Sequence, residues 1–464
     1  MGKIEQHGEL WTQVRRIGWI LGIVAVGPAA QTQGWQISSN LNVKADLTLK
    51  EAFDSNIYLQ DNAPYPTNVA LARAAGYQPV EANKSSWITV ITPKLGLGYK
   101  PSPAFGVLMG YAPEVAFYES AHSEDYITHR GTLNFGGKAG NTLWELANTA
   151  TYIDGSHEGP TFARPDDIPA IGGIPIRDRR DAFIFRNSFR LTQPIGDWFF
   201  RPVACAYVHD FKTAQHWVPS AIRTRNYSYE NYIDRQDVNG GLDIGYRVAK
   251  ETHVVVGYRY GNQQQFNGPL PTTGQMVDSP YDSTYNRVLF GLEGNPASWL
   301  KVNILVGPEF RNFYELSALH QIRPQFDADE VLVYMDVSIV ATLSKADAVT
   351  FKGTRFEQPA FSSFSVYEDN KYDLSWRHKF GEKFSTTLGF MLYIGDWKTS
   401  SNRDDWIYSP SILLGYNFNQ HLGAEANYAY EWVENKFDNS ALEPLAKSHE
   451  YTRHLVSLRL KYTF

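Results

Sequence analysis

Apolar and polar side chains alternate along most of this chain with a period of two, which is the period of a β-strand. The last segment, residues 452–464, shows the pattern most clearly, and one of its faces carries His454, Val456, Leu458, Leu460, Tyr462 and Phe464. The same alternation runs through residues 254–261, 300–311 and 422–432. Runs of about 8 to 13 residues suit a tilted membrane strand better than a soluble sandwich strand, which is typically nearer 5 or 6 residues. The pattern therefore predicts membrane-spanning strands.

Short polar links and long irregular connections follow one another in turn between the predicted strands. The eight short links fall at residues 100–102, 138–141, 193–197, 249–252, 295–298, 344–347, 381–383 and 419–421. The long connections fall at 60–84, 154–178, 213–235, 266–282, 316–330 and 434–450. Tight turns at one end and long loops at the other are typical of an outer-membrane barrel. Eight tight turns define sixteen strands, and a first strand near 43–53 and the closing strand bring the prediction to about eighteen, with a range of 16–18.

The fold class follows from the hydrogen bonds of such strands. In hydrocarbon no water can satisfy an open sheet edge, so the first and last strands must pair. A strand with one apolar face also needs water on its other face, and a sheet closed around an aqueous lumen meets both demands. We therefore predict an all-β, transmembrane, antiparallel up-and-down β-barrel.

Prolines and aromatic residues refine this prediction. Five prolines fall inside predicted strands on the outward register, where each removes a ladder donor and predicts a bulge or a break: Pro93, Pro113, Pro202, Pro308 and Pro410. Aromatic residues near strand ends predict interfacial girdles, with plain cross-strand pairing as the alternative: Trp87, Tyr99, Trp198, Tyr207, Trp406, Phe418, Trp432 and Tyr462.

The first 33 residues differ from the rest. Arg15 and Arg16 precede a ten-residue apolar run at 17–26, and small residues follow at 27–30. This order predicts a secretory signal peptide over residues 1–33, removed near Ala30 to Gln33, and a single barrel domain over 34–464. A buried core helix is the alternative, but it would contain three glycines. The expected destination is the bacterial outer membrane, after export through the inner membrane.

Composition removes several other classes. Aromatic residues make up 14% of the chain, and Cys205 is the sole cysteine, so neither an internal disulfide nor a CxxC metal site exists. The net charge of −6 gives no reason to expect nucleic acid as a partner. We expect no cofactor and no metal site.

Part of the chain resembles a known family. Residues 47–61 (LTLKEAFDSNIYLQD), 85–105 (SSWITVITPKLGLGYKPSPAF) and 111–118 (YAPEVAFY) look like the start of the β-barrel porins of Gram-negative and related diderm bacteria. The resemblance is strongest over about residues 45–118 and at the final strand. It implies an outer-membrane, porin-like protein with no catalytic residues to transfer. The closing strand resembles the C-terminal assembly signal of outer-membrane barrels at Val456, Leu458, Leu460, Tyr462 and Phe464.

The inward register collects charges of both signs, and these residues are the pore-lining candidates: Lys94, Glu145, Arg186, Arg190, Arg201, Asp243, Arg247, Arg259, Arg287, Glu293, Glu309, Arg311, Asp336, Asp373, Arg377, Glu425, Glu431, Arg453 and Arg459. Charged rings on a wall tune ion selectivity. Alternatively, the charges merely hydrate the lumen and pair across strands. Both interpretations give a polar conduit.

Three functions remain open at this level. The first is a porin-like channel for passive diffusion of small hydrophilic solutes. The second is a structural, export or surface-interaction barrel with a plugged lumen, and loops 60–84 and 154–178 are long enough either to constrict it or to lie outside. The third, a barrel enzyme such as a lipid hydrolase or protease, finds no GxSxG or HExxH motif. Expected partners are outer-membrane lipid, the barrel-assembly machinery and, by analogy with large porins, further copies in a trimer.

Overall fold

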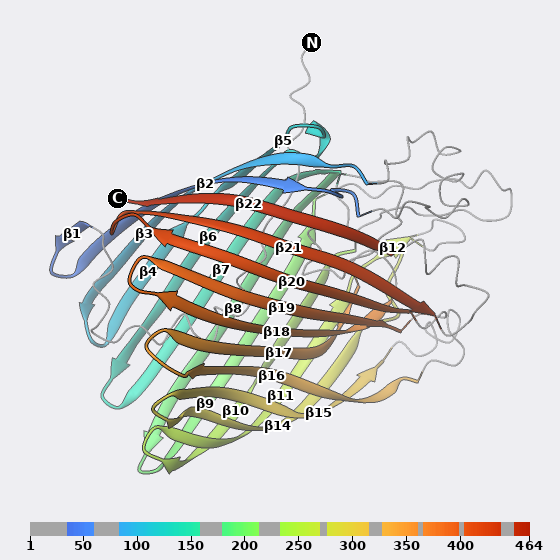
Figure 1. Cartoon of the computed structure of the whole chain (residues 1–464). Coiled ribbons are helices and arrows are strands. Elements are labelled where there is room, and N and C mark those ends of the chain that lie inside the picture. Colours follow the sequence, from blue (N-terminus) through green and yellow to red (C-terminus); the bar gives the residue numbers. More distant parts are fainter. Residues whose placement is uncertain are drawn as a thin grey trace, which may run out of the picture.

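The computed structural model describes residues 35–59, 83–157, 179–212, 233–269, 276–314, 327–360, 365–398, 403–437 and 450–464. Within them, eighteen antiparallel strands close into one barrel (Figure 1), which confirms the predicted fold class and strand count. No helix in these ranges is long and apolar enough to cross a membrane.

The wall strands follow one another around the barrel in chain order. They are β2 (Leu41–Asp54), β3 (Ser86–Ser102), β4 (Phe105–Tyr111) continued by β5 (Glu114–Tyr118), β6 (Tyr126–Ala139), β7 (Thr142–His157), β8 (Arg179–Ile195), β9 (Trp198–Phe211), β10 (Arg235–Ala249), β11 (Thr252–Gln265), β14 (Ser283–Ala297), β15 (Leu300–Phe313), β16 (Asp329–Thr342), β17 (Asp347–Pro359), β18 (Val366–Phe380), β19 (Phe384–Trp397), β20 (Arg403–Asn417), β21 (Leu422–Phe437) and β22 (Tyr451–Thr463). Outside the wall lie β1 (Trp35–Ser38), β12 (Gly268–Pro269), β13 (Met276–Val277) and one 3-10 turn, η1 (His122–Glu124).

The first and last wall strands join the sheet to itself. β2 pairs with β22 from Asp46 opposite Thr463 to Asp54 opposite Leu455. β22 ends there, and β1 folds back to pair with β2 around Val43, so the start of β2 also gains a partner. The closure leaves no open edge at this junction, as a membrane barrel requires.

All eight predicted tight links join neighbouring strands at one end of the barrel, which we call the short-turn end. The opposite end, here the long-loop end, carries the longer connections, most of whose residues lie outside the described ranges. The wall strands other than β4 and β5 are 13 to 17 residues long. That is longer than predicted, because most of them continue past the apolar band into the polar part of the long-loop end.

The prolines interrupt the sheet as predicted. Pro113 lies between β4 and β5, and beside each of Pro93, Pro202, Pro308 and Pro410 one of the two neighbouring ladders skips residues. At Pro202 the ladder to β10 on the other side stays continuous. A missing N–H therefore costs the sheet pairing on one side only.

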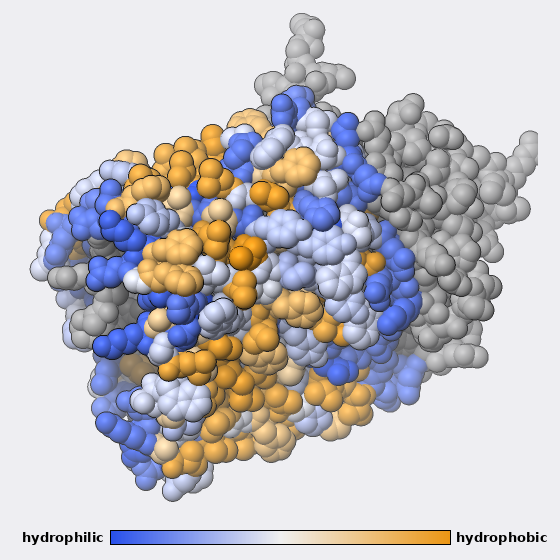
Figure 2. All heavy atoms as spheres, in the orientation of Figure 1, coloured by the Kyte–Doolittle hydropathy of each residue, from blue (hydrophilic) through white to orange (hydrophobic). Residues whose placement is uncertain are grey.

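The two faces of the sheet differ in polarity. Large apolar side chains gather across the middle of the visible surface, with hydrophilic residues toward both ends (Figure 2). The outward side chains of the closing strand belong to this apolar surface, and Leu458 at its centre is 54% exposed. Seven of the eight predicted girdle aromatics also lie on the outward register, but Tyr207 was wrongly placed there. It faces inward, because it shares the inner face of β9 with Arg201 and Cys205.

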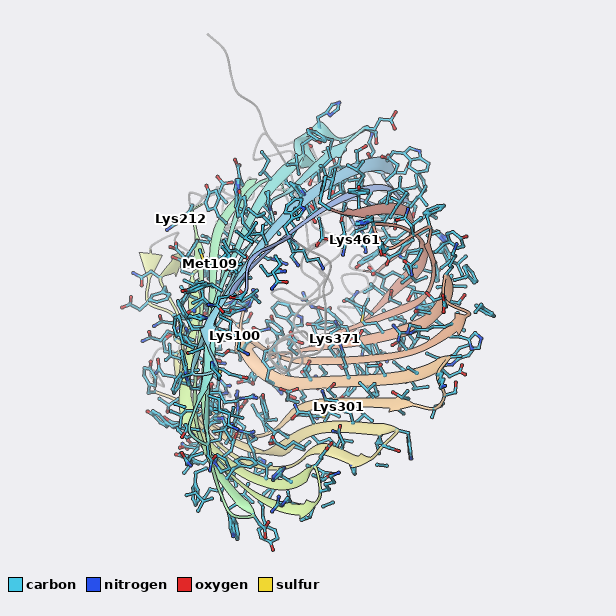
Figure 3. All side chains as sticks on the ribbon, turned by 90° about the vertical axis from the view of Figure 1, so that its left-hand side faces the viewer. Lys100, Met109, Lys212, Lys301, Lys371 and Lys461 are labelled. Carbon is cyan, nitrogen blue, oxygen red and sulfur yellow. The ribbon has the colours of Figure 1, made fainter. Side chains whose placement is uncertain are left out.

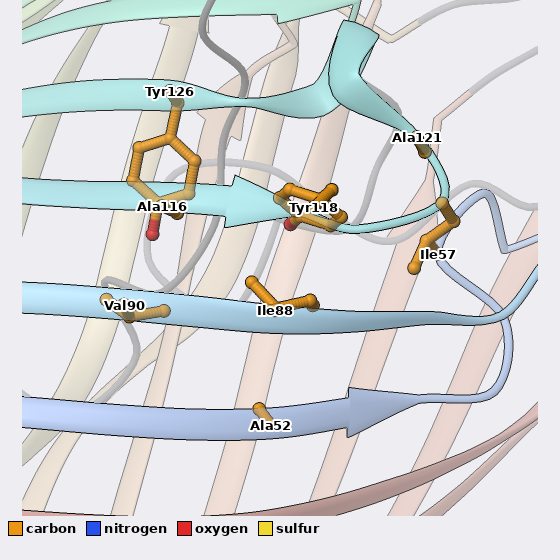
Figure 4. Close-up of a cluster of buried hydrophobic side chains, with 8 residues drawn as sticks. All are labelled: Ala52, Ile57, Ile88, Val90, Ala116, Tyr118, Ala121 and Tyr126. Atoms are coloured by element: carbon orange, nitrogen blue, oxygen red, sulfur yellow. The ribbon is translucent and has the colours of Figure 1, made fainter.

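The inner face at the long-loop end is densely packed. Ile57, in the segment that follows β2, packs with Ile88, Tyr118 and Tyr126 against the inner wall of β2 to β6 (Figure 4). Two residues on, Leu59 packs against buried side chains of β19 to β22. The chain after β2 therefore turns into the barrel rather than away from it.

Candidate functional site in the lumen

A cavity of about 470 Å³ lies inside the barrel between β7–β11 and β14–β18. Its lining mixes charged side chains with a few apolar ones, such as Leu289, Leu305 and Phe356. Cys205 lines it as well, and although this residue lies midway along β9, it is exposed to solvent. The inner wall is therefore wet at mid-barrel depth.

Arginines dominate one side of this cavity, and acidic residues neutralise several of them. Arg201 is 2.9 Å from Asp243 and 2.8 Å from Glu293. Arg259 makes a second contact with Asp243 at 2.7 Å. Alternating signs on adjacent strands hold these long side chains against the wall. The central cavity thus presents matched charges rather than a field of one sign.

The sheet overlaps itself at the long-loop end of this cavity. β17 pairs with β16 only as far as Arg355 opposite Met335, whereas it pairs with β18 along its whole length. Beyond that point β17 contacts β11, although three strands separate them in the sheet. The outer part of the β17–β18 hairpin has therefore left β16 and lies inside the barrel. We call residues 356–360 and 365–367 the hairpin tip.

Side chains from the opposing wall hold the hairpin tip in place. Arg235 of β10 donates to the Pro359 carbonyl at 2.6 Å, Gln263 of β11 donates to the Glu357 carbonyl at 3.1 Å, and Gln265 donates to that of Ala360. These carbonyls belong to the stretch that no longer pairs with β16. Arginine and glutamine donors therefore replace ladder hydrogen bonds, as buried carbonyls require.

A buried charge cluster completes the anchor. Glu357 lies on the outward register of β17, yet its carboxylate is 3.0 Å from the Arg311 guanidinium, which projects inward from β15. Both side chains are fully buried, and Glu309 pairs with Arg311 and Arg287 beside them. Contact between an outward-register residue and an inward-facing one requires the two layers of sheet to overlap.

All nineteen predicted pore-lining residues lie on the inner face, in three groups. The cavity brings together Glu145, Arg186, Arg190, Arg201, Asp243, Arg259, Arg287, Glu293, Asp336 and Asp373. Toward the short-turn end lie Lys94, Arg247, Arg377, Glu425 and Arg459. The last group is buried in contacts at the long-loop end and faces no open lumen: Glu309, Arg311, Glu431 and Arg453. Whether the first two groups line a conducting path stays a prediction.

Sequence reasoning missed the hairpin anchors Arg235, Gln263 and Glu357. A signal for Glu357 exists, because the outward register of a lipid-facing strand should not carry Arg355 and then Glu357. The loops that were predicted as candidate constrictions fall mostly at 60–82 and 158–178, outside the described residues. The constriction among the described residues is built from wall strands instead.

No cluster of three or more His, Cys, Asp or Glu suited to a metal ion occurs in the described ranges. The cofactor and metal expectations gain no further support from this observation.

No family model matches the chain, and no curated protein matches its sequence. Solved structures of outer-membrane channels do match. The outer membrane protein OpdK of Pseudomonas aeruginosa is 10% identical, with a TM-score of 0.41 over 91% of this chain and 98% of that one. A BenF-like porin from Pseudomonas fluorescens Pf-5 is 8% identical, with a TM-score of 0.42 over 91% and 99%. OccAB3 of Acinetobacter baumannii is 11% identical, with a TM-score of 0.34 over 91% and 99%.

The chain folds as an outer-membrane porin barrel. This agrees with the architecture that the family resemblance implies. Identities near one in ten and TM-scores below 0.5 say nothing about which solute this porin-type barrel takes.

Proposed function

We propose that the protein is a porin-like channel of the bacterial outer membrane, through which small hydrophilic solutes diffuse passively along a charged aqueous lumen. The observation that carries the proposal is the polar cavity at mid-barrel depth, where Cys205 meets solvent. A structural barrel does not need a hydrated interior, whereas a diffusion channel does. Tight turns are periplasmic in such barrels, so the short-turn end would face the periplasm and the long-loop end the outside.

The hairpin tip and the packed segment around Leu59 favour a second candidate, a barrel with a plugged lumen that serves in structure, export or surface interaction. The two candidates share the same location and the same expected partners. These are outer-membrane lipid, the barrel-assembly machinery acting on the closing strand, and further copies of the chain.

Single-channel recording in planar bilayers separates the two candidates. We expect the refolded mature chain to give discrete, ohmic conductance steps, and liposomes that contain it to swell in small sugars. The control is the same preparation after heat unfolding. A barrel that is folded by circular dichroism but gives neither steps nor swelling would rule out the open channel and leave the plugged barrel.

A further inference from the structure

The inner wall near the short-turn end carries basic side chains that have no acidic partner. They come from four strands spread around the barrel: Lys44 of β2, Lys138 of β6, Lys301 of β15, and Arg377 and Lys379 of β18. All five lie within four residues of a strand end at the short-turn end. We call this set the basic vestibule. Figure 3 looks into this end and shows other lysines of the interior, including Lys100, Lys301 and Lys461, on separate parts of the wall.

Their register places these side chains on the inner face. Lys301 shares the face of β15 that carries the cavity residues Asn303 and Leu305. Arg377 shares the face of β18 that carries Lys371 and Asp373. The other three follow in the same way from their strand pairs. The basic vestibule therefore surrounds the passage between the short-turn end and the cavity.

The inward acids on this side are already engaged. Asp46 accepts a hydrogen bond from Thr463 and lies 3.7 Å from Lys461, and Glu425 pairs with Arg459 at 2.9 Å. Among the described residues, no ion pair or hydrogen bond engages the side chains of Lys44, Lys138, Lys301, Arg377 or Lys379. The vestibule thus holds an excess of positive charge, although the whole chain carries a net charge of −6.

We propose that the basic vestibule makes the channel selective for small anions and that these five residues determine the selectivity. The inference rests on the proposed channel function. A mouth lined by one sign of charge between low-dielectric walls concentrates the opposite ion, and rings of lysine and arginine favour anions in other pores. The matched arginines deeper in the cavity add little net field, so the vestibule sets the preference. Because its side chains reach water, salt screens it, with a Debye length of about 10 Å at 0.1 M and about 3 Å at 1 M.

The test is the reversal potential across a planar bilayer in a KCl gradient. We expect the wild-type channel to reverse toward the chloride potential near 0.1 M salt and to lose most of this preference near 1 M. In a variant with K44E, K138E, K301E, R377E and K379E, the permeability ratio of chloride to potassium should fall by at least about threefold. K301E with K379E alone should give an intermediate shift if the fivefold variant fails to fold.

The matched control is a variant with K250E, K345E and K383E. These lysines lie in tight turns at the same end, are exposed, and undergo the same charge change outside the inner face. Loss of anion preference in the vestibule variants but not in this control supports the inference. A conducting wild-type channel without anion preference, or equal loss in the control, overturns the inference and leaves the channel function standing. A folded barrel with no conductance contradicts the channel function itself.

Discussion

Replacing Arg311 with glutamine is expected to raise the single-channel conductance severalfold. The guanidinium of this residue holds Glu357 of the hairpin tip and Glu309 of β15 in one buried cluster. Removing one partner of a buried ion pair leaves an uncompensated charge and costs about 3–5 kcal/mol. Since about 1.4 kcal/mol changes a population tenfold, a loss of this size is enough to release the hairpin tip from the opposing wall.

The released strand has another partner at hand. The outer part of β16, residues 329–333, pairs with β15 on one side and has no strand on its β17 side among the described residues. Continuing the β16–β17 register would bring Gln358 opposite Leu332, and the barrel would widen by the width of the overlap. The double variant L332C/Q358C in a C205A background should therefore cross-link readily with R311Q and poorly without it.

E357Q is the control for this experiment, because it removes the carboxylate that R311Q would strand while leaving the backbone carbonyl bonds of the hairpin tip in place. Its conductance should stay near that of the wild type. Unchanged conductance and unchanged cross-linking in R311Q would mean that the overlap does not limit the lumen.

The second large effect concerns stability. R453A is expected to lower the free energy of unfolding by about 3–5 kcal/mol. Arg453 of β22 donates to Asp54 of β2 at 2.9 Å across the junction that closes the barrel, and both side chains are at most 2% exposed. The substitution leaves Asp54 charged and buried, and the closure is the one junction that chain connectivity does not support.

R459A provides a matched comparison on the same face of the same strand. Arg459 pairs with Glu425, also at 2.9 Å, but the two side chains are 43% and 42% exposed. Solvent screens such a pair, so its loss should cost about 0–1 kcal/mol. Urea titration of both variants in lipid vesicles measures the difference. Equal losses would show that water reaches Asp54 and that the closure does not depend on this pair.

The architecture was predictable because each strand carries its own record of two solvents. The alternation in the closing strand and the eight tight turns required only local pattern, and they gave the class, the strand count and the inward face. Outward prolines such as Pro202 were also predictable as interruptions, since the missing donor is a local property. Tyr207 was misplaced because an aromatic near a strand end fits both an interfacial girdle and a lumen wall.

The site was predictable only in part. Register placed Arg201 and Asp243 on the inner face, but their pairing with Glu293 depends on which strands become neighbours and on side-chain reach. The overlap of the hairpin tip is a tertiary event, in which β17 exchanges ladder bonds for side-chain donors three or four strands away. The one local hint was the charged outward register at Arg355 and Glu357.

Reactivity of Cys205 in the folded barrel tests the aqueous lumen most directly. As the sole cysteine, it reports mid-barrel depth without any substitution. A membrane-impermeant, bulky thiosulfonate reagent added to an open channel should react with Cys205 and reduce the conductance stepwise, while C205A stays unaffected. A thiol that reacts only after unfolding would contradict a water-filled passage at this depth.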